Sequence, residues 1–115
     1  FNPNEHDILE SKIKQAKETA YTSSVEGVLA SQKGMIERFD RKSVLENFEG
    51  KILVLSGKHD SAVNSEKTIK NLPERTNIKS YVLDCGHNGH WEKPEICASI
   101  INTELLHHLP KNLVF

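Results

Sequence analysis

Apolar residues in the first part of the chain recur with the period of an α-helix. Between about residues 4 and 21 they stand at every third or fourth position, at Leu9, Ile13, Ala16 and Ala20. This spacing places them on one face of a helix, with polar residues on the other face. Asn4 or Asp7 has a side chain suited to cap the first turn. The pattern therefore predicts an amphipathic helix over residues 4–21.

A second helical pattern follows after a short break. Apolar residues over 25–36 again recur at the helical period, and Ser23 or Ser24 can cap the first turn. The apolar face is less regular than in the first helix. Residues 39–50 then indicate a turn and a short helix.

The pattern changes after residue 51. Residues 52–55 are all apolar, without the alternation of a strand that has one face in water. Such a run is typical of a parallel strand buried on both faces. A polar-faced helix is predicted over residues 65–72, and residues 78–83 indicate a second strand. A last helix is predicted to begin at Pro94, with a buried side formed by Ile96, Ile100, Leu105 and Leu106.

These elements predict an α/β fold in the order helix, helix, strand, helix, strand, helix. Two strands joined by a helix are expected to be parallel neighbours in one sheet. In sheets of this kind, ligands and catalytic groups lie beyond the carboxyl ends of the strands. Chemistry is therefore expected in the loops that follow the two predicted strands.

The two loops contain an acid and a histidine. Asp60 follows the first strand, and His87 follows the second. Neighbouring strands lie about 4.8 Å apart, so these two side chains can meet. A carboxylate that accepts a hydrogen bond from an imidazole fixes the ring tautomer and stabilises the imidazolium ion. We expect the two groups to approach within about 2.6–3.5 Å.

Composition narrows the classes of partner. The 115 residues suffice for one small domain. The formal net charge is -1 with basic and acidic residues interleaved, so neither nucleic acid nor a membrane surface is an expected partner. No stretch approaches the roughly 20 apolar residues of a membrane helix. The two cysteines, Cys85 and Cys97, form no disulfide framework, and we expect a cytoplasmic protein with reduced thiols.

Both loop segments resemble a known family. Residues 52–60, Ile-Leu-Val-Leu-Ser-Gly-Lys-His-Asp, resemble the strand-Gly-x-x-Asp segment that carries the acid in α/β-hydrolases. Residues 86–95, with Gly-His at the start and Glu-x-Pro-Glu at the end, resemble the segment that enters their last helix. Residues 34–45 resemble the return from cap to core in the esterase and lactonase branch. The resemblance extends over residues 25–108.

The resemblance implies a fold and an activity. The fold is the C-terminal part of an α/β-hydrolase parallel sheet with flanking helices, preceded by cap helices. Residues 1–40 are then a cap-derived helical segment, and residues 41–115 belong to the core. The activity is hydrolysis of a small ester, lactone or similar carbonyl substrate through a Ser-His-Asp triad, without a metal or cofactor. Asp60 is the implied orienting acid and His87 the implied general base, and their order along the chain agrees with the family.

The nucleophile that this family requires is missing from the sequence. A nucleophile elbow reads Gly-x-Ser-x-Gly and precedes the acid, but no serine here has glycines at that spacing. Neither cysteine precedes Asp60. We therefore expect a C-terminal fragment of a serine hydrolase that is inactive alone, with the serine upstream of Phe1. Two alternatives stay open: a non-catalytic relative that binds a ligand or a partner, and a dehalogenase- or epoxide-hydrolase-type enzyme with an Asp nucleophile.

Other residues near the loops have simpler expected roles. We interpret His59 as a solvent-facing loop residue and His90 as a structural hydrogen-bond partner near the site. Trp91 is expected to pack under the last helix, and Cys97 to be a small core residue. The chain also offers a set of potential zinc ligands, namely Cys85, His87, His90 and Glu92. We disfavour a zinc site, because this strand end makes a shared tetrahedron awkward.

The strand over residues 52–55 also bears on assembly. In a whole α/β-hydrolase, its outer edge pairs with a strand that would precede Phe1. Without that partner, the backbone N–H and C=O groups of the edge are a template for pairing with another chain. We therefore expect self-association or pairing with the missing N-terminal portion, and a small molecule as substrate.

Overall fold

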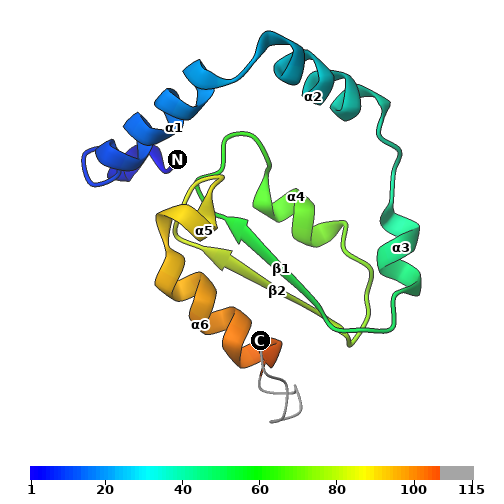
Figure 1. Cartoon of the computed structure of the whole chain (residues 1–115). Helices are drawn as coiled ribbons and strands as arrows, with labels where there is room; N and C mark the ends of the chain where they lie inside the picture. The colour runs from blue at the N-terminus through cyan, green and yellow to red at the C-terminus, as the bar shows by residue number, and fades with distance from the viewer. Residues whose placement is uncertain (107–115) are drawn as a thin grey trace.

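The structure, a computed structural model, is built around two parallel strands and describes residues 1–106 (Figure 1). Mixed helices and strands with a parallel sheet confirm the predicted α/β class. The end of the predicted core, residues 107–115, lies outside the described residues. The elements in chain order are the 3₁₀ helix η1 Pro3–Glu5, α1 Glu10–Thr22, α2 Val25–Glu37, α3 Lys42–Asn47, β1 Ile52–Gly57, α4 Ser65–Lys70, β2 Ile78–Leu83, α5 Gly89–Glu92 and α6 Pro94–Glu104.

β1 and β2 pair in parallel, as predicted, and α4 connects them. Ile52 lies opposite Ile78 at the start of the pairing, and Gly57 lies opposite Leu83 at its end. The ladder continues past the strands, because the Lys58 N–H donates to the Leu83 carbonyl oxygen over 2.8 Å. The loops after β1 and β2 therefore leave the same end of the sheet.

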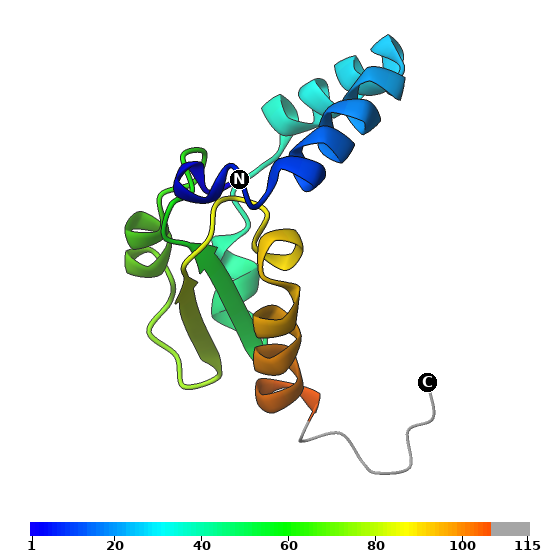
Figure 2. The ribbon, with the colours of Figure 1, turned by 90° about the vertical axis from the view of Figure 1, so that its left-hand side faces the viewer.

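The core lies between the sheet and α6. Its buried members are Leu83, Cys85 and Cys97, and partly buried Leu55, Tyr81 and Ile100 pack against them. Figures 1 and 2 show α4 and α6 on opposite sides of the sheet. The prediction that β1 is buried on both faces is wrong, because its side chains are only partly buried. The sheet has only two strands within residues 1–106, so its faces are too narrow for full cover.

Helix starts agree with the sequence in part. The Ser24 hydroxyl caps α2 by accepting from the Gly27 N–H over 3.0 Å, which confirms the predicted cap. The first helix, in contrast, begins later than predicted. Asn2 instead caps η1, where its side chain accepts from the Asn4 N–H over 3.0 Å, and Pro3 favours a separate first turn. A turn follows, and α1 begins only at Glu10.

The last helical segment is divided in two. α5 is a separate short helix that the sequence did not predict, and α6 begins at Pro94 as predicted. Leu105 follows the last helical residue. The predicted burial of Ile96 and Leu106 is wrong, because these residues are 50% and 42% exposed.

α1, α2 and α3 form an arch beside the sheet in Figure 1, and Figure 2 shows α1 and α2 extending away from it. None of the three helices has a buried residue. The segment before α1 is different, because Asn2 and Leu9 are buried.

The division into a cap segment over residues 1–40 and a core over 41–115 stays a prediction. The exposed large apolar residues of α2 are Val25, Val28, Leu29, Met35 and Ile36.

Candidate active site

Two glycines allow the loops after β1 and β2 to touch. A Cβ atom on Gly57 would lie 2.0 Å from the carbonyl oxygen of Gly86 and 2.7 Å from that of Cys85, so no larger residue fits there. Just beyond it, the His59 N–H donates to the Cys85 carbonyl oxygen over 2.9 Å. The backbone thus holds the two loops side by side at the end of the sheet.

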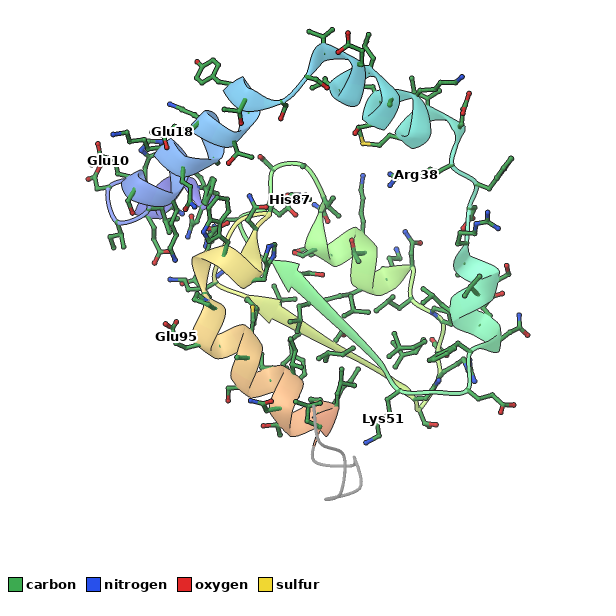
Figure 3. The ribbon with its side chains drawn as sticks, viewed as in Figure 1. Glu10, Glu18, Arg38, Lys51, His87 and Glu95 are labelled. Atoms are coloured by element: carbon green, nitrogen blue, oxygen red, sulfur yellow. The ribbon has the colours of Figure 1, made fainter. Side chains whose placement is uncertain are left out.

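This contact brings Asp60 and His87 together. The Nδ1 atom of His87 lies 2.8 Å from Oδ2 of Asp60, which confirms the predicted approach of the two side chains. The Asp60 side chain is 7% exposed, whereas that of His87 is 55% exposed. Figure 3 shows His87 beside the end of the sheet, below the arch. Within residues 1–106, Asp60 is the one hydrogen-bond partner of the His87 ring, so Nε2 is available to another group.

The second carboxylate oxygen of Asp60 organises its own loop. Oδ1 accepts from the backbone N–H groups of Ala62 and Val63 over 2.8 Å and 2.9 Å. Asp60 therefore both closes a turn and contacts the histidine. Burial opposes ionisation, but hydrogen bonds from Val63, His87 and Ala62 lower the pKa of the Asp60 carboxyl below its usual value. The group is an ionised acceptor at neutral pH.

The carboxylate of Glu92, on α5, accepts hydrogen bonds from the backbone of the His87 loop. Oε2 of Glu92 accepts from the N–H groups of Asn2 and Gly86 over 2.8 Å and 2.9 Å, and Oε1 accepts from the Asn88 N–H over 3.2 Å. Burial alone would raise the pKa of Glu92. Hydrogen bonds from the N–H groups of Gly86, Asn2 and Asn88 instead hold its pKa below the usual value. From the sequence, Glu92 was expected only as part of the α/β-hydrolase resemblance and of the disfavoured set of zinc ligands.

A second acid–histidine pair links the same loops. Nε2 of His59 lies 2.7 Å from Oδ1 of Asp84, and the His59 side chain is 25% exposed. The interpretation of His59 as a solvent-facing residue is therefore wrong. Its pairing with Asp84 follows from the same parallel geometry that pairs Asp60 with His87, since all four residues lie just beyond the strand ends. The strand spacing that predicted the first pair could have predicted the second.

A cavity of about 380 Å³ adjoins the Asp60–His87 pair. It runs along the open edge of β1 between α4 and α6, with lining residues that include Val54, Leu55, Thr68 and Ile101. A larger hollow of about 680 Å³ lies at the other end of the strands, between Lys51 and Leu105. The chemistry places the candidate site at the smaller cavity, because only that one includes an acid and a histidine in contact.

The described residues offer neither a metal centre nor an activated thiol. Residues 1–106 hold no group of three or more His, Cys, Asp or Glu side chains arranged for a metal ion. Cys85 and Cys97 are buried and unpaired by a disulfide, and the burial of Cys97 confirms its predicted place in the core. Burial, reinforced by the nearby charge of Glu92, raises the pKa of the Cys85 thiol and keeps it protonated.

Two neighbouring residues differ from their expected roles. The exposed side chain of His90 lines the cavity, but it makes no hydrogen bond to any other residue of 1–106, so the predicted hydrogen-bond role is not seen. Trp91 packs against the ring of Phe1, with 5.5 Å between ring centroids. Its carbonyl oxygen also accepts from Lys12 Nζ over 2.6 Å. Trp91 thus anchors the N-terminal segment, and its expected packing under the last helix stays a prediction.

Comparisons with models of protein families, with curated proteins and with solved structures find no match. The resemblance to α/β-hydrolases therefore rests on the residues of this chain alone. Over residues 1–106, none of the helices combines the length and apolar character needed to cross a membrane.

Proposed function

We propose that this chain provides the acid and the general base of a serine hydrolase of the α/β-hydrolase type, and that the nucleophile lies outside it. The substrate class is a small ester, lactone or similar carbonyl compound. The observation that carries the proposal is the 2.8 Å contact between Asp60 and His87 beyond two adjacent parallel strands. An exposed imidazole on a largely buried carboxylate is the arrangement that general-base catalysis requires.

The proposed chemistry follows from the two ring nitrogens of His87. The Nδ1–H group donates a hydrogen bond to Asp60, so Nε2 is the unprotonated, basic atom of the ring. Nε2 takes the proton of a serine hydroxyl as that oxygen attacks the carbonyl carbon, and then returns it to the leaving alcohol. Asp60 stays ionised throughout and stabilises the imidazolium, in keeping with its lowered pKa.

Two observations support a nucleophile outside the chain. Within residues 1–106, His87 has no hydrogen bond to a serine, threonine or cysteine side chain. In addition, the cavity beside His87 is bordered by β1, whose outer edge carries no strand among these residues. In the proposed enzyme, further strands of the sheet continue from this edge and bring the serine to His87.

A serine-reactive fluorophosphonate probe tests the proposal on the full product of the gene that encodes this chain. We expect one labelled serine outside the present sequence. Its labelling should fall by about 10³-fold or more in the His87→Ala and Asp60→Asn variants. His6→Ala is the matched control, because His6 is an exposed histidine outside the lining of this cavity, and it should keep labelling within a few-fold.

The present chain alone should show no His87-dependent turnover of p-nitrophenyl acetate. Such turnover by a monomeric chain, or labelling of the full protein that ignores His87, would contradict the proposal. Full protein without any probe-reactive serine would also contradict it. In that case, turnover of an epoxide or a haloalkane would favour the Asp-nucleophile alternative, and inactivity on all three classes would favour a binding module.

A further inference from the structure

Glu92 is the one acidic residue among 1–106 that is buried as a whole, with 5% of its surface exposed. A buried carboxylate is costly unless hydrogen bonds replace the lost water. Three backbone N–H groups do so, those of Asn2, Gly86 and Asn88. Charge-assisted bonds of this kind are shorter and stronger than neutral ones. The proposed hydrolysis uses none of the atoms of Glu92, so its burial calls for a separate explanation.

The positions of two of these donors provide that explanation. Gly86 and Asn88 are the residues on either side of His87, and each donates to a different oxygen of Glu92. A single carboxylate therefore fixes the backbone immediately before and immediately after the histidine. With both sides of the residue fixed, the direction in which its side chain leaves the loop is fixed as well.

The third donor, the N–H of Asn2, belongs to the N-terminal segment, which packs against the same loop. A Cβ atom on Gly86 would lie 2.4 Å from the carbonyl carbon of Phe1 and 2.5 Å from the nitrogen of Asn2. The chain can pass this closely only over a glycine. Since Asn2 donates to the same oxygen of Glu92 as Gly86, the carboxylate joins α5, the His87 loop and the N-terminal segment at one point.

We propose that Glu92 is a positioning residue that holds the His87 imidazole in the orientation in which Nδ1 meets Asp60. The catalytic meaning of this role rests on the proposed function, but the geometric role does not. Without the carboxylate, the buried N–H of Gly86 and the partly buried N–H of Asn88 lose their acceptor, and the loop must rearrange to satisfy them. The Asp60–His87 contact is the first thing that such a rearrangement disturbs.

Glu92→Gln is the sharpest variant, because glutamine has the same shape but only one acceptor oxygen. If that oxygen serves Asn2 and Gly86, the amide NH₂ group faces the N–H of Asn88, donor against donor. Glu92→Asp complements it, since the charge stays but the shorter side chain cannot reach both sides of His87. Glu95→Gln is the matched control, because Glu95 is exposed on α6 and makes no side-chain hydrogen bond within residues 1–106 (Figure 3).

Imidazole ¹⁵N NMR of the 115-residue chain measures the effect directly, since it reports which ring nitrogen of neutral His87 carries the proton. The unsubstituted chain and Glu95→Gln should show a proton fixed on Nδ1. In Glu92→Gln and Glu92→Asp, the Nδ1 and Nε2 shifts should move toward each other as the tautomers mix, while the backbone spectrum away from the loop stays unchanged. A role in stability alone would leave the tautomer of a folded variant as it was.

An Asp60→Asn chain separates this inference from the proposed function. The single amide oxygen is needed by the N–H groups of Ala62 and Val63, so the NH₂ group faces His87 and disfavours a proton on Nδ1. If Asp60→Asn leaves the tautomer unchanged, the acid–histidine pair itself is wrong. If Asp60→Asn mixes the tautomers but both folded Glu92 variants keep the proton on Nδ1, only the positioning role of Glu92 is wrong. Unfolding of both Glu92 variants would assign Glu92 to the stability of the whole chain and would equally overturn the positioning role.

Discussion

At the scale of single residues, the site depends on how closely two loops can approach. Gly57 ends β1 and lies directly against the backbone of Cys85 and Gly86. Backbone atoms cannot move aside as the end of a flexible side chain can. The absence of one carbon atom at residue 57 is therefore a condition for the contact between Asp60 and His87.

Gly57→Ala should separate the loops and destabilise the chain. The new Cβ would lie 2.0 Å from the carbonyl oxygen of Gly86, so the His87 loop must shift. We expect a loss of about 1–3 kcal/mol, the usual cost of overpacking, together with loss of the Asp60–His87 hydrogen bond. Denaturant unfolding and the imidazole ¹⁵N shifts of His87 measure the two effects.

Gly34→Ala is the control for the Gly57 variant. Nothing lies within 4 Å of a Cβ at Gly34, which is in the last turn of α2. Alanine favours a helix interior over glycine by up to about 1 kcal/mol, so this variant should be neutral or more stable. A Gly57→Ala chain as stable as Gly34→Ala, with the His87 tautomer unchanged, would show that the loops tolerate the added atom.

The sequence predicted the contact of Asp60 with His87, because strand spacing alone brings together groups that follow adjacent parallel strands. It did not predict the role of Glu92. The partners of that carboxylate are backbone N–H groups, which every residue except proline carries, so no pattern of side chains marks them. The buried position of Glu92 also depends on α5, a four-residue helix too short to produce a periodic pattern.

At the scale of elements, carboxylates connect parts of the fold that apolar packing leaves loosely joined. Glu92 connects α5 to the His87 loop. Glu104 connects α6 to β2, because its carboxylate accepts from Lys79 Nζ over 2.8 Å and from the Tyr81 hydroxyl. Hydrogen bonds from Lys79 and Tyr81 lower the pKa of Glu104 against the opposing effect of burial.

Acid should therefore loosen these connections. Asp60, Glu92 and Glu104 all have folded-state pKa values below the ordinary values of 3.8 for Asp and 4.5 for Glu. Over this range the unfolded chain binds more protons than the folded chain, so stability falls as pH falls. The stability that the three ionised carboxylates contribute to the fold is fully present above about pH 5, and it is lost as pH falls through their lowered pKa values.

Denaturant midpoints measured from pH 7 down to pH 3 test this expectation. The midpoint should drop below about pH 5, and the drop should be smaller in Glu104→Gln, which no longer has a charge to lose at this position. Glu95→Gln should follow the unsubstituted chain, because this exposed side chain makes no hydrogen bond within residues 1–106. Equal acid sensitivity in all three chains would mean that Glu104 gains no stability from Lys79 and Tyr81.

Prediction of the elements themselves succeeded where a local signal was strong. The apolar run at the start of β1 and the proline at the start of α6 each fixed an element within a few residues. The first helix was extended too far toward the N-terminus, because residues before Glu10 share its polar character. Their actual place is decided by distant partners, such as the salt bridge of 2.7 Å between Glu5 and Lys93.

At the scale of the whole molecule, one edge of the sheet and the helices α1, α2 and α3 have no covering partner among residues 1–106. β1 has β2 on one side and no strand on the other within residues 1–106. Apolar side chains of α2, such as Leu29 at 63% and Ile36 at 82%, are exposed. The sequence could not place α2, because an apolar helix face predicts that something covers it but not which partner does so. Exposed apolar surface of this kind favours association.

The open edge of β1 should therefore pair with a second copy of the chain when the chain is alone. The N–H groups of Ile52 and Lys58 donate toward β2 and its loops, to Asn77 and Leu83. Because donors alternate along a parallel strand, the N–H groups of Leu53 and Leu55 point to the open side. Light scattering should give a mass of at least twice that of one chain at high concentration. Amide hydrogen exchange should then slow at Leu53 and Leu55 relative to a dilute sample.

The amides of Ile52 and Val54 serve as the internal control for this experiment. They belong to the same strand but face β2, so they should be protected at both concentrations. A monomer at every concentration would contradict the expected pairing. So would an assembly in which Leu53 and Leu55 exchange as fast as in the dilute chain, because its contacts would then lie elsewhere, with the exposed face of α2 as the first surface to test. Slowing confined to Leu53 and Leu55 would identify the β1 edge as the surface that another strand covers.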